Sequence, residues 1–532
     1  MAAETALARG SDLEERREAE AELAAALEGE PIAEPLAAES ARARPAPGEP
    51  ELKPFSSLVP AIIGAAMLMQ TLSATVIANA LPPMAVSLHE DPVRLNTLIS
   101  VYLLSLAIFL PISGWAADRF GAKRVFLIAI GLYAASCAAC GFATNLPELL
   151  LARVAEGAAG ALMGPVGRLV LLRSTPKHDL VRAMSVLTMP SMLGPVIGPP
   201  IGGFIVTYMS WRWIFFLNLP IAVLGIVLVT KYIADIKEEE AGPLDWIGMI
   251  LSGLGMAGVI YGFESFGQSQ LDHSHPGHGH VAHSHVAPWL APTMMGGGLA
   301  LLGVYAWHAK RTPHAILDLS LFRIKTFYAS VVGGTFMRMG VGATPFLLAL
   351  LLQVAFGMSP FQAGLMTFAS AAAALVMKTC VPPILERLGF RTTLSVNAVI
   401  VGLSFMTYAL FYKEMPHWMM YAILLTGGFF RSLQFTALNG LAYADIDTPQ
   451  MSRASTMSAM GQRLAQSIGI GFAATMLHFL QGHFHATHVT SQVIGPAFII
   501  IGIVALLSGL FFVVLPANAG AELHGRPRPI RA

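Results

Sequence analysis

Two short charged loops interrupt apolar stretches in the two halves of this sequence, and they share one order of residue types. The first loop, residues 114–124, contains Gly114, Asp118, Arg119, Gly121, Lys123 and Arg124. The second loop, residues 386–391, contains Glu386, Arg387, Gly389 and Arg391. A carboxylate in such a loop can cap a helix N-terminus and pair with a cation such as Arg119 or Lys123. Because charges cannot lie in hydrocarbon, we expect both loops at a membrane surface, in a chain built by duplication.

Arg153 and Glu156 lie three residues apart in another apolar run, so on a helix they share one face. Burying either charge alone in a membrane would be costly, whereas together they can share charge. A buried carboxyl that is balanced by one cation could bind and release a proton. We therefore expect Glu156 to be the main proton carrier inside the membrane, with Arg153 as its partner. A purely structural ion pair near the outer mouth is the alternative interpretation.

Further cations and amides lie in the apolar runs, where such groups normally face a cavity or an acid. We expect a substrate cavity that contains Gln70, Arg338, Gln353, Arg431 and Asn439. Residues of the same character are Arg168, Gln434, Gln462, Arg463 and Gln466. The second half has almost no acids in its apolar runs, so this cavity should be more basic than that of a cationic-drug exporter and would suit an anionic or zwitterionic substrate. Alternatively, Arg431 and Arg463 line the cytoplasmic rim.

Six histidines crowd one short polar segment between two apolar runs. They are His273, His275, His278, His280, His283 and His285. Imidazoles at this density suit Zn²⁺, Cu²⁺ or Ni²⁺, so a weak divalent-metal site is expected in this loop on the outer side. A solvated linker without metal is the alternative. Transport of metal ions is disfavoured, because the apolar runs lack clustered Cys, His and Asp ligands.

The composition indicates a membrane protein rather than a soluble one. Hydrophobic residues make up 55% of the chain and charged residues 12%, whereas a soluble domain carries roughly 25% charged residues. The net charge of +1 argues against a nucleic-acid partner. No G-x-x-x-x-G-K-[ST] motif occurs, which argues against an ATP-driven pump, and no catalytic constellation is visible. We expect neither an enzyme nor a bound cofactor.

About fourteen apolar runs reach the ~20 residues that a helix needs to cross a bilayer. The predicted spans are 58–80, 95–117, 124–143, 149–173, 184–207, 213–234, 245–266, 289–308, 327–354, 360–380, 393–411, 418–438, 455–480 and 493–515. The two charged loops follow spans two and ten. An ancestral six-helix unit would therefore start again at span nine. The expected fold is all-α and membrane-integral, with two six-helix bundles and two inserted helices.

Basic residues are concentrated in alternate loops, which the positive-inside rule places in the cytoplasm together with both termini. Residues 1–55 are polar and proline-rich, and we expect a mostly disordered cytoplasmic tail. The remaining plan is a six-helix bundle at 56–235, two inserted helices with the outer His-rich loop at 236–312, a second bundle at 313–517 and a cytoplasmic tail at 518–532.

Motifs in the first half resemble those of the major facilitator superfamily. Residues 114–124 match its signature G-x-x-x-D-R-x-G-x-K-R, and residues 153–157 are similar to its Arg-x-x-Gln-Gly element. Residues 194–203 look like the antiporter signature, and fourteen spans are typical of the EmrB/QacA-type drug:proton antiporters. Shorter stretches near residues 69–82, 165–169 and 345–365 are similar to those of one bacterial multidrug transporter of this type. The resemblance covers roughly residues 58–515.

This resemblance implies a conformational latch in the charged loops, meaning contacts that hold one state and break in the other. It also implies that predicted span five presents a smooth glycine face at the interface between the halves and closes a leak path there. That antiporter helix contains Gly194, Pro195, Gly198, Pro199, Gly202 and Gly203. Loop geometry alone, and an ordinary helix-packing groove, are the alternative interpretations.

The sequence departs from the family pattern in span one. Such transporters usually carry Asp-x-Thr there, whereas this chain has Ser73-Ala74-Thr75. Glu156 stands where the span-four element usually has Gln. Because family architecture places spans one and four side by side, the two changes suggest that the acid has moved from one helix to its neighbour.

The function expected from these observations is proton-driven export of small organic compounds or drugs across the bacterial inner membrane, with two halves that rock around a central site. The expected partners are the lipid bilayer, the small-molecule substrate and protons. Export of a metabolite or metal chelate is one alternative. Another is a membrane sensor without transport activity that uses the His-rich loop.

Overall fold

A computed structural model of the chain describes residues 57–90, 95, 97–234, 242–273, 289–312, 315–358, 360–484, 490–516 and 518–520. These residues belong to one compact unit, which spans residues 55–532. The part of the chain that the structure describes is helical and contains no strand. The predicted tail at 1–55, residues 521–532 of the predicted tail at 518–532, and five of the six loop histidines lie outside the described residues. His273 ends a helix, and the structure does not describe its side chain.

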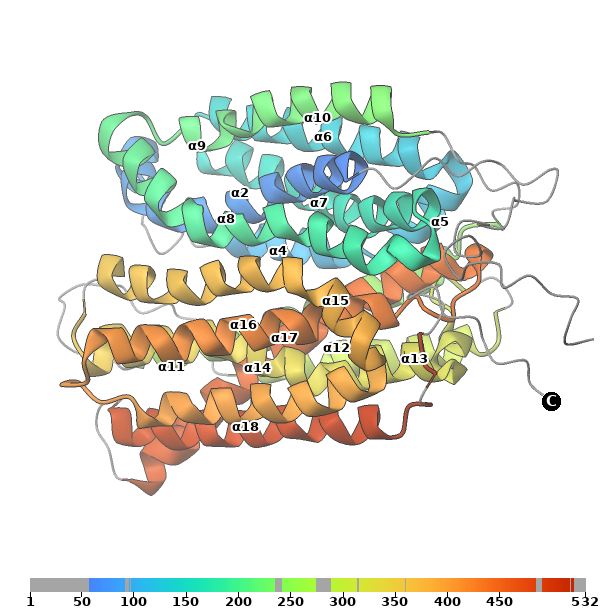
Figure 1. Cartoon of the computed structure of the whole chain (residues 1–532). Coiled ribbons are helices and arrows are strands. Elements are labelled where there is room, and N and C mark those ends of the chain that lie inside the picture. The colour runs from blue at the N-terminus through green and yellow to red at the C-terminus, as the bar shows by residue number, and fades with distance from the viewer. Residues whose placement is uncertain are drawn as a thin grey trace, which may run out of the picture. The chain divides into compact units, whose positions relative to one another are not determined.

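The first half forms one group of helices, drawn in blue to green in Figure 1. Its helices are α2 (Leu58–Leu88), α4 (Thr97–Phe109), α5 (Ile112–Phe120), α6 (Ala122–Phe142), α7 (Leu146–Ser174), α8 (Leu180–Tyr208), α9 (Trp213–Phe216) and α10 (Asn218–Tyr232), with the short η1 (Lys177–Asp179) before α8. Helices α4 and α5 correspond to a single predicted span, which is bent by 56° next to Pro111.

The second half forms a second group, drawn in yellow to red below the first in Figure 1. Its helices are α13 (Lys325–Tyr328), α14 (Gly334–Ala349), α15 (Pro360–Thr407), α16 (His417–Leu441), α17 (Met451–His483) and α18 (Ser491–Val513). Short helical segments connect them, namely η2 (Leu319–Arg323), η3 (Ala329–Gly333), η4 (Leu350–Ala355), η5 (Tyr408–Leu410) and η6 (Thr448–Gln450). Segments η3 and η4 are π-helical, so the chain from α13 to η4 forms one continuous helix with two π-helical segments.

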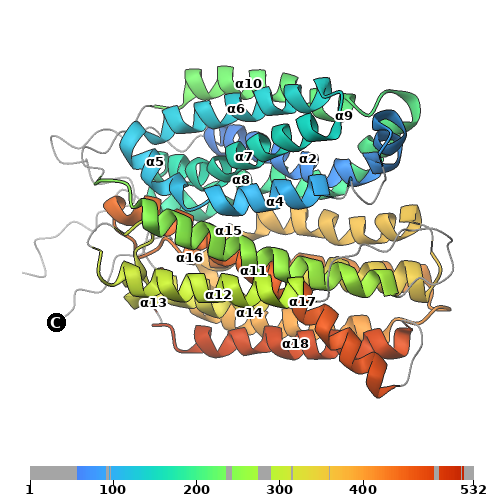
Figure 2. The same ribbon diagram turned by 180° about the vertical axis from the view of Figure 1, so that it is seen from behind.

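The two inserted helices are α11 (Trp246–His273) and α12 (Leu290–Ala309). Helix α11 packs against α4 of the first half and α17 of the second, and α12 packs against α11. Figure 2 shows α11 beside α4. The close approach of α11 and α12 depends on Gly258 and Gly298, because a Cβ at either position would collide with the backbone of the other helix. The insertion therefore contacts both halves.

Helices lie at all fourteen predicted ranges, with α15 covering two of them across a break at Gly389. Among the described residues, however, only nine helices are long and apolar enough to cross a membrane, or ten when α4 and α5 are counted as one bent span. Helices α16 and α17 are not among them. Their polar residues have a structural explanation, because both helices line a central cavity. The count of fourteen crossings stays a prediction.

The two charged loops share one backbone feature. Gly121 separates α5 from α6 with φ of 90°, and Gly389 breaks α15 with φ of 72°. Residues with a side chain rarely adopt this left-handed region, whereas glycine does so readily. The glycine common to both loops is thus required by the turn, which is evidence for a repeated unit.

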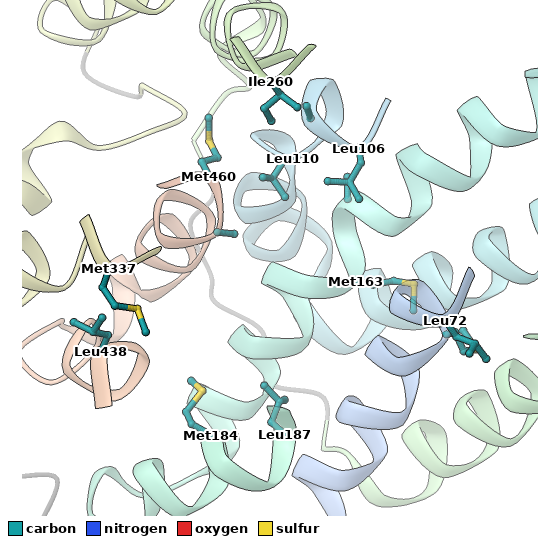
Figure 3. Close-up of a cluster of buried hydrophobic side chains, with 14 of the residues drawn as sticks. Leu72, Leu106, Leu110, Met163, Met184, Leu187, Ile260, Met337, Leu438 and Met460 are labelled. Carbon is teal, nitrogen blue, oxygen red and sulfur yellow. The ribbon is translucent and has the colours of Figure 1, made fainter. Parts of the chain in front are cut away.

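Buried apolar side chains from both halves and from the insertion form a continuous core. In Figure 3, Leu72, Met163 and Leu187 come from the first group of helices, and Met337 and Leu438 from the second. Their close packing fixes the helices that carry the polar residues described next.

Candidate functional site

A central cavity of about 1220 Å³ lies between the two halves. Helices α2, α4, α7 and α8 of the first half and α14 to α17 of the second contribute to its wall. The lining is mostly apolar, with Phe368 and Phe435 among its residues. A cavity of this size and character can enclose a drug-sized organic molecule.

Four of the five residues predicted for a substrate cavity line it, namely Gln70, Gln353, Arg431 and Asn439. Additional polar lining comes from Arg168, Gln462, Arg463 and Gln466. The fifth predicted residue, Arg338, does not line the cavity and is only 1% exposed. Its guanidinium donates to the Ser330 carbonyl at 2.7 Å and approaches Asn439 Oδ1 at 3.5 Å, so it lies behind the wall.

Arg153 and Glu156 form an ion pair on α7, with 2.8 Å between Nη1 and Oε2 and no exposure of either side chain. The other carboxylate oxygen of Glu156 accepts a hydrogen bond of 2.6 Å from Ser73 on α2. Arg153 also donates to the Leu98 carbonyl at 3.3 Å, and its guanidinium lies 4.3 Å from the centre of the Tyr102 ring. The carboxylate is therefore held between α2 and α7, at the position where the family acid is missing from α2.

This buried carboxylate lies close behind the cavity wall. Gln70 is three residues before Ser73, Gly160 is four residues after Glu156, and both line the cavity. The Gln70 amide donates to the Gly160 carbonyl at 3.1 Å, which ties α2 to α7 in this layer. A change in the charge of Glu156 would therefore act on two helices that shape the cavity.

The sequence suggested that Asp118 pairs with Arg119 or Lys123, but the structure gives its carboxylate other partners. Its carboxylate accepts a hydrogen bond of 2.9 Å from Arg173 at the end of α7, and its other oxygen accepts one from Ser452 of α17. Lys123 instead donates to the Thr230 carbonyl at 3.1 Å. The reason lies in the helical geometry, because α7 and α17 converge on Asp118 while Arg119 is exposed.

More contacts join α17 to the first half at this end of the helices, called here the Asp118 end. The hydroxyls of Ser113 and Thr456 are 3.0 Å apart, and Ser455 donates to the Pro165 carbonyl at 2.9 Å. A Cβ at Gly114 would come within 2.8 Å of the Thr456 hydroxyl. The cavity lining, by contrast, extends to Ala363 in the first turn of α15, at the opposite end. The two halves therefore meet at the Asp118 end of the cavity.

In the second charged loop, Glu386, Arg387 and Arg391 are exposed. This loop therefore shares the glycine turn of the first loop but has no partly buried carboxylate like that of Asp118.

The glycines of α8 were expected at the interface between the halves, but Gly194 and Gly198 face helix α2 of the first half. A Cβ at Gly194 or Gly198 would collide with Thr71 or Thr75 of α2, so these glycines pack within the first half rather than against the second. Thr75 also approaches the Gly194 carbonyl at 3.3 Å. Gly202 is buried in the same helix, and the structure does not describe the side chains of Pro195 and Pro199 or the surroundings of Gly203.

Lys378 of α15 was not among the predicted site residues, yet it is only 1% exposed. Its ammonium donates to the Thr436 hydroxyl and lies 5.9 Å from the centre of the Phe435 ring. Lys378 stands near the end of predicted span 360–380, where a lysine would reach the membrane surface. Helix α15 instead continues without a break to Gly389, which places Lys378 well inside the bundle. Extending that span would have revealed it.

Among the described residues, no three His, Cys, Asp or Glu side chains come together as metal ligands would. The histidines at 275, 278, 280, 283 and 285 lie outside these residues, so the weak metal site stays a prediction.

A cavity between two helical groups, with the halves in contact at one end, is the architecture of a membrane transporter. The chain belongs to the Major Facilitator Superfamily, whose model matches residues 63–322 and 330–530.

Its curated relatives include the "Probable transport protein HsrA" of Haemophilus influenzae, 33% identical over 450 residues, which are 85% of this chain and 92% of that protein. The "Putative multidrug resistance protein MdtD" of Yersinia pestis is 33% identical over 471 residues, 87% of this chain and 97% of that protein. The resemblance to transporters of the MdtD type, indicated by residues near 69–82, 165–169 and 345–365, is thereby confirmed.

Two solved structures share the fold. The human organic anion transporter MFSD10 (TETRAN) matches with a TM-score of 0.59 and 14% identity, over 86% of this chain and all of that one. The proton:xylose symporter XylE matches with a TM-score of 0.56 and 14% identity, over 88% of this chain and 98% of that one. The expected fold class, an all-α membrane protein of the major facilitator type, is confirmed.

Proposed function

We propose that this transporter exports small organic compounds across the bacterial inner membrane in exchange for protons, by alternating access. The observation that carries the proposal is the buried Glu156 carboxylate, which contacts Ser73 on α2 and Arg153 on α7. A transporter that lacks the usual acid on its first span still holds a carboxylate at that point. Two of its relatives are named as a transport protein and a multidrug resistance protein, which supports export as the direction of transport.

Alternating access is supported by the way the halves meet. The positive-inside distribution of loop cations favours a cytoplasmic location for the Asp118 end and for both termini. The cavity would then be closed toward the cytoplasm by contacts of Asp118 and Ser113 with α17. Opening toward the cytoplasm requires these contacts to break, which makes Asp118, together with Arg173, the conformational latch in our proposal.

Proton coupling follows from the charge of Glu156. When the carboxylate is ionised, it accepts hydrogen bonds from Ser73 and Arg153 and holds α2 against α7. Protonation removes the ion pair and leaves the Arg153 charge buried without its counter-charge, a state that the protein can relieve only by rearranging. Because α2 and α7 line the cavity, proton and substrate bias the same two-state equilibrium, as antiport demands.

The test is substrate-driven proton movement in proteoliposomes with an imposed pH gradient. The Glu156→Gln variant keeps the size and hydrogen-bonding capacity of the side chain but cannot release a proton. We expect it to bind substrate and to lose proton movement, while Glu414→Gln, an exposed loop control, behaves as the parent. Proton flux that persists unchanged in Glu156→Gln would overturn the assignment of Glu156. Absence of flux in folded parent protein for every compound would overturn proton coupling.

A further inference from the structure

The charges that line the cavity have one sign. Arg168 of α7, Arg431 of α16 and Arg463 of α17 all contribute to the wall, and no acidic residue is among the lining side chains that the structure describes. Arg431 donates to the Ser370 hydroxyl at 2.5 Å, and Arg168 has its nitrogen Nε 3.4 Å from the Gly164 carbonyl. The Ser370 hydroxyl and the Gly164 carbonyl are neutral and do not cancel the charge of either guanidinium.

Two more cations lie buried behind the wall of the second half. Arg338 donates hydrogen bonds to the Ser330 carbonyl and the Asn439 side chain, and Lys378 donates one to the Thr436 hydroxyl. One nitrogen of Arg338, Nε, has no hydrogen-bond partner in the structure. Helices α14, α16, α17 and α18 contain no Asp or Glu, and the acid of α15, Glu386, lies exposed beside Gly389.

Buried cations without acids are expensive in a membrane protein and are found where they serve a ligand or a charge pathway. In a low-dielectric cavity, their fields add to a positive potential that attracts anions and repels cations. The buried acid nearest to the wall on α7, Glu156, does not cancel this potential, because its charge is already balanced by Arg153. The rest of the lining is apolar and includes Phe368 and Phe435, which suits a hydrophobic body.

We propose that the substrates of this transporter are amphipathic organic anions, with a carboxylate or sulfonate held by the cavity arginines and an aromatic or aliphatic body against the apolar wall. This inference rests on the proposed function and names its substrate class. Arginine is suited to the task, since its guanidinium binds planar acid groups through paired hydrogen bonds. A lipophilic cation of the same size would meet an uncompensated positive field.

The test compares two probes with the same body and opposite charges, pyrene-1-sulfonate and pyren-1-ylmethylammonium. Equilibrium binding of each to the purified full chain is measured by fluorescence anisotropy. We expect tighter binding of the sulfonate, and we expect Arg431→Gln and Arg168→Gln each to weaken it about tenfold, the usual loss for a charge-assisted hydrogen bond. Arg323→Gln removes the same charge from an exposed position outside the cavity and should leave binding unchanged.

Should a glutamine variant fail to fold, Arg431→Lys keeps the charge without the planar fork and should bind the sulfonate more weakly than the parent. Equal or tighter binding of the ammonium probe, no binding of the sulfonate, or arginine variants that bind it as the parent does would each overturn the inference. Transport is scored separately in proteoliposomes. Sulfonate binding without proton-linked movement would contradict the proposed coupling while supporting the substrate class.

Discussion

At the scale of single residues, the contact between Ser73 and Glu156 explains how a family acid can change helices. The serine oxygen lies 2.6 Å from the Glu156 carboxylate, so an acid on either residue would occupy nearly the same place. Two acids there would repel each other at close range, and a protein with one at position 156 has no room for a charge at 73. This geometry supports our hypothesis that the acid moved from α2 to α7.

This geometry predicts a rescue. In Ser73→Asp/Glu156→Gln the carboxylate returns to α2, within reach of the same partners, and proton movement lost in Glu156→Gln should reappear in proteoliposomes. The matched control is Ser73→Asn/Glu156→Gln, which has similar shape but no group that can titrate, and which should stay uncoupled. Equal proton flux from both double variants would contradict the idea that one carboxylate between α2 and α7 carries the proton.

A second prediction at this scale concerns Lys378, whose ammonium contacts the Thr436 hydroxyl and the Phe435 ring. Replacing buried ionic groups by apolar ones of similar volume is often stabilising, by about 1–4 kcal/mol. Lys378→Met should therefore raise the thermal unfolding temperature while weakening the binding of pyrene-1-sulfonate. Lys413→Met, on an exposed loop, should change neither. A fall in unfolding temperature for Lys378→Met would show that the ammonium stabilises the fold.

The sequence predicted which residues belong to the site better than it predicted the residues that they contact. Arg153 and Glu156 lie three residues apart, and helical periodicity alone predicts their pairing. The pairing of Asp118 with Arg173 and Ser452 joins residues 55 and 334 positions apart, and no local pattern contains it. Arg338 was expected in the cavity because a cation within an apolar run normally faces a cavity or an acid. An apolar run does not tell which face of the helix the cation is on, and Arg338 is buried behind the wall.

At the scale of helices, positions of the spans were predictable and their packing was not. Long apolar runs mark α6, α10 and α18 clearly, because lipid contact demands apolar surface on most sides. The same logic weakens for α16 and α17, whose polar residues line the cavity. The glycine face of α8 was expected at the interface between the halves, yet Gly194 and Gly198 face α2, because a smooth glycine surface fits any close neighbour equally well.

The repeated turn allows a prediction about these helices. A Cβ at Gly389 would meet no atom within 4 Å, so alanine there suffers only from its backbone conformation at φ of 72°. This strain should cost about 1–3 kcal/mol. Gly303→Ala is the matched control, since Gly303 is also in open space but within helix α12, where alanine gains about 0.4–1 kcal/mol. Thermal unfolding should place the two variants on opposite sides of the parent; a Gly389→Ala protein at least as stable as the parent would contradict the need for glycine.

At the scale of the whole molecule, the proposed alternating access requires the halves to separate at the Asp118 end, where α5 and α7 meet α17. The hydroxyls of Ser113 and Thr456 are 3.0 Å apart across this contact, close enough for cysteines at both positions to form a disulfide with little movement. In Ser113→Cys/Thr456→Cys, oxidation should join the halves and reduce transport in proteoliposomes to background, and a reductant should restore it.

Each single cysteine variant, treated identically, should transport as the parent does and so excludes an effect of the native cysteines 137, 140 and 380. Substrate binding should survive oxidation, because neither Ser113 nor Thr456 lines the cavity. If the disulfide forms fully and transport continues at the rate of the parent, the halves do not need to part here, and alternating access through this contact is wrong.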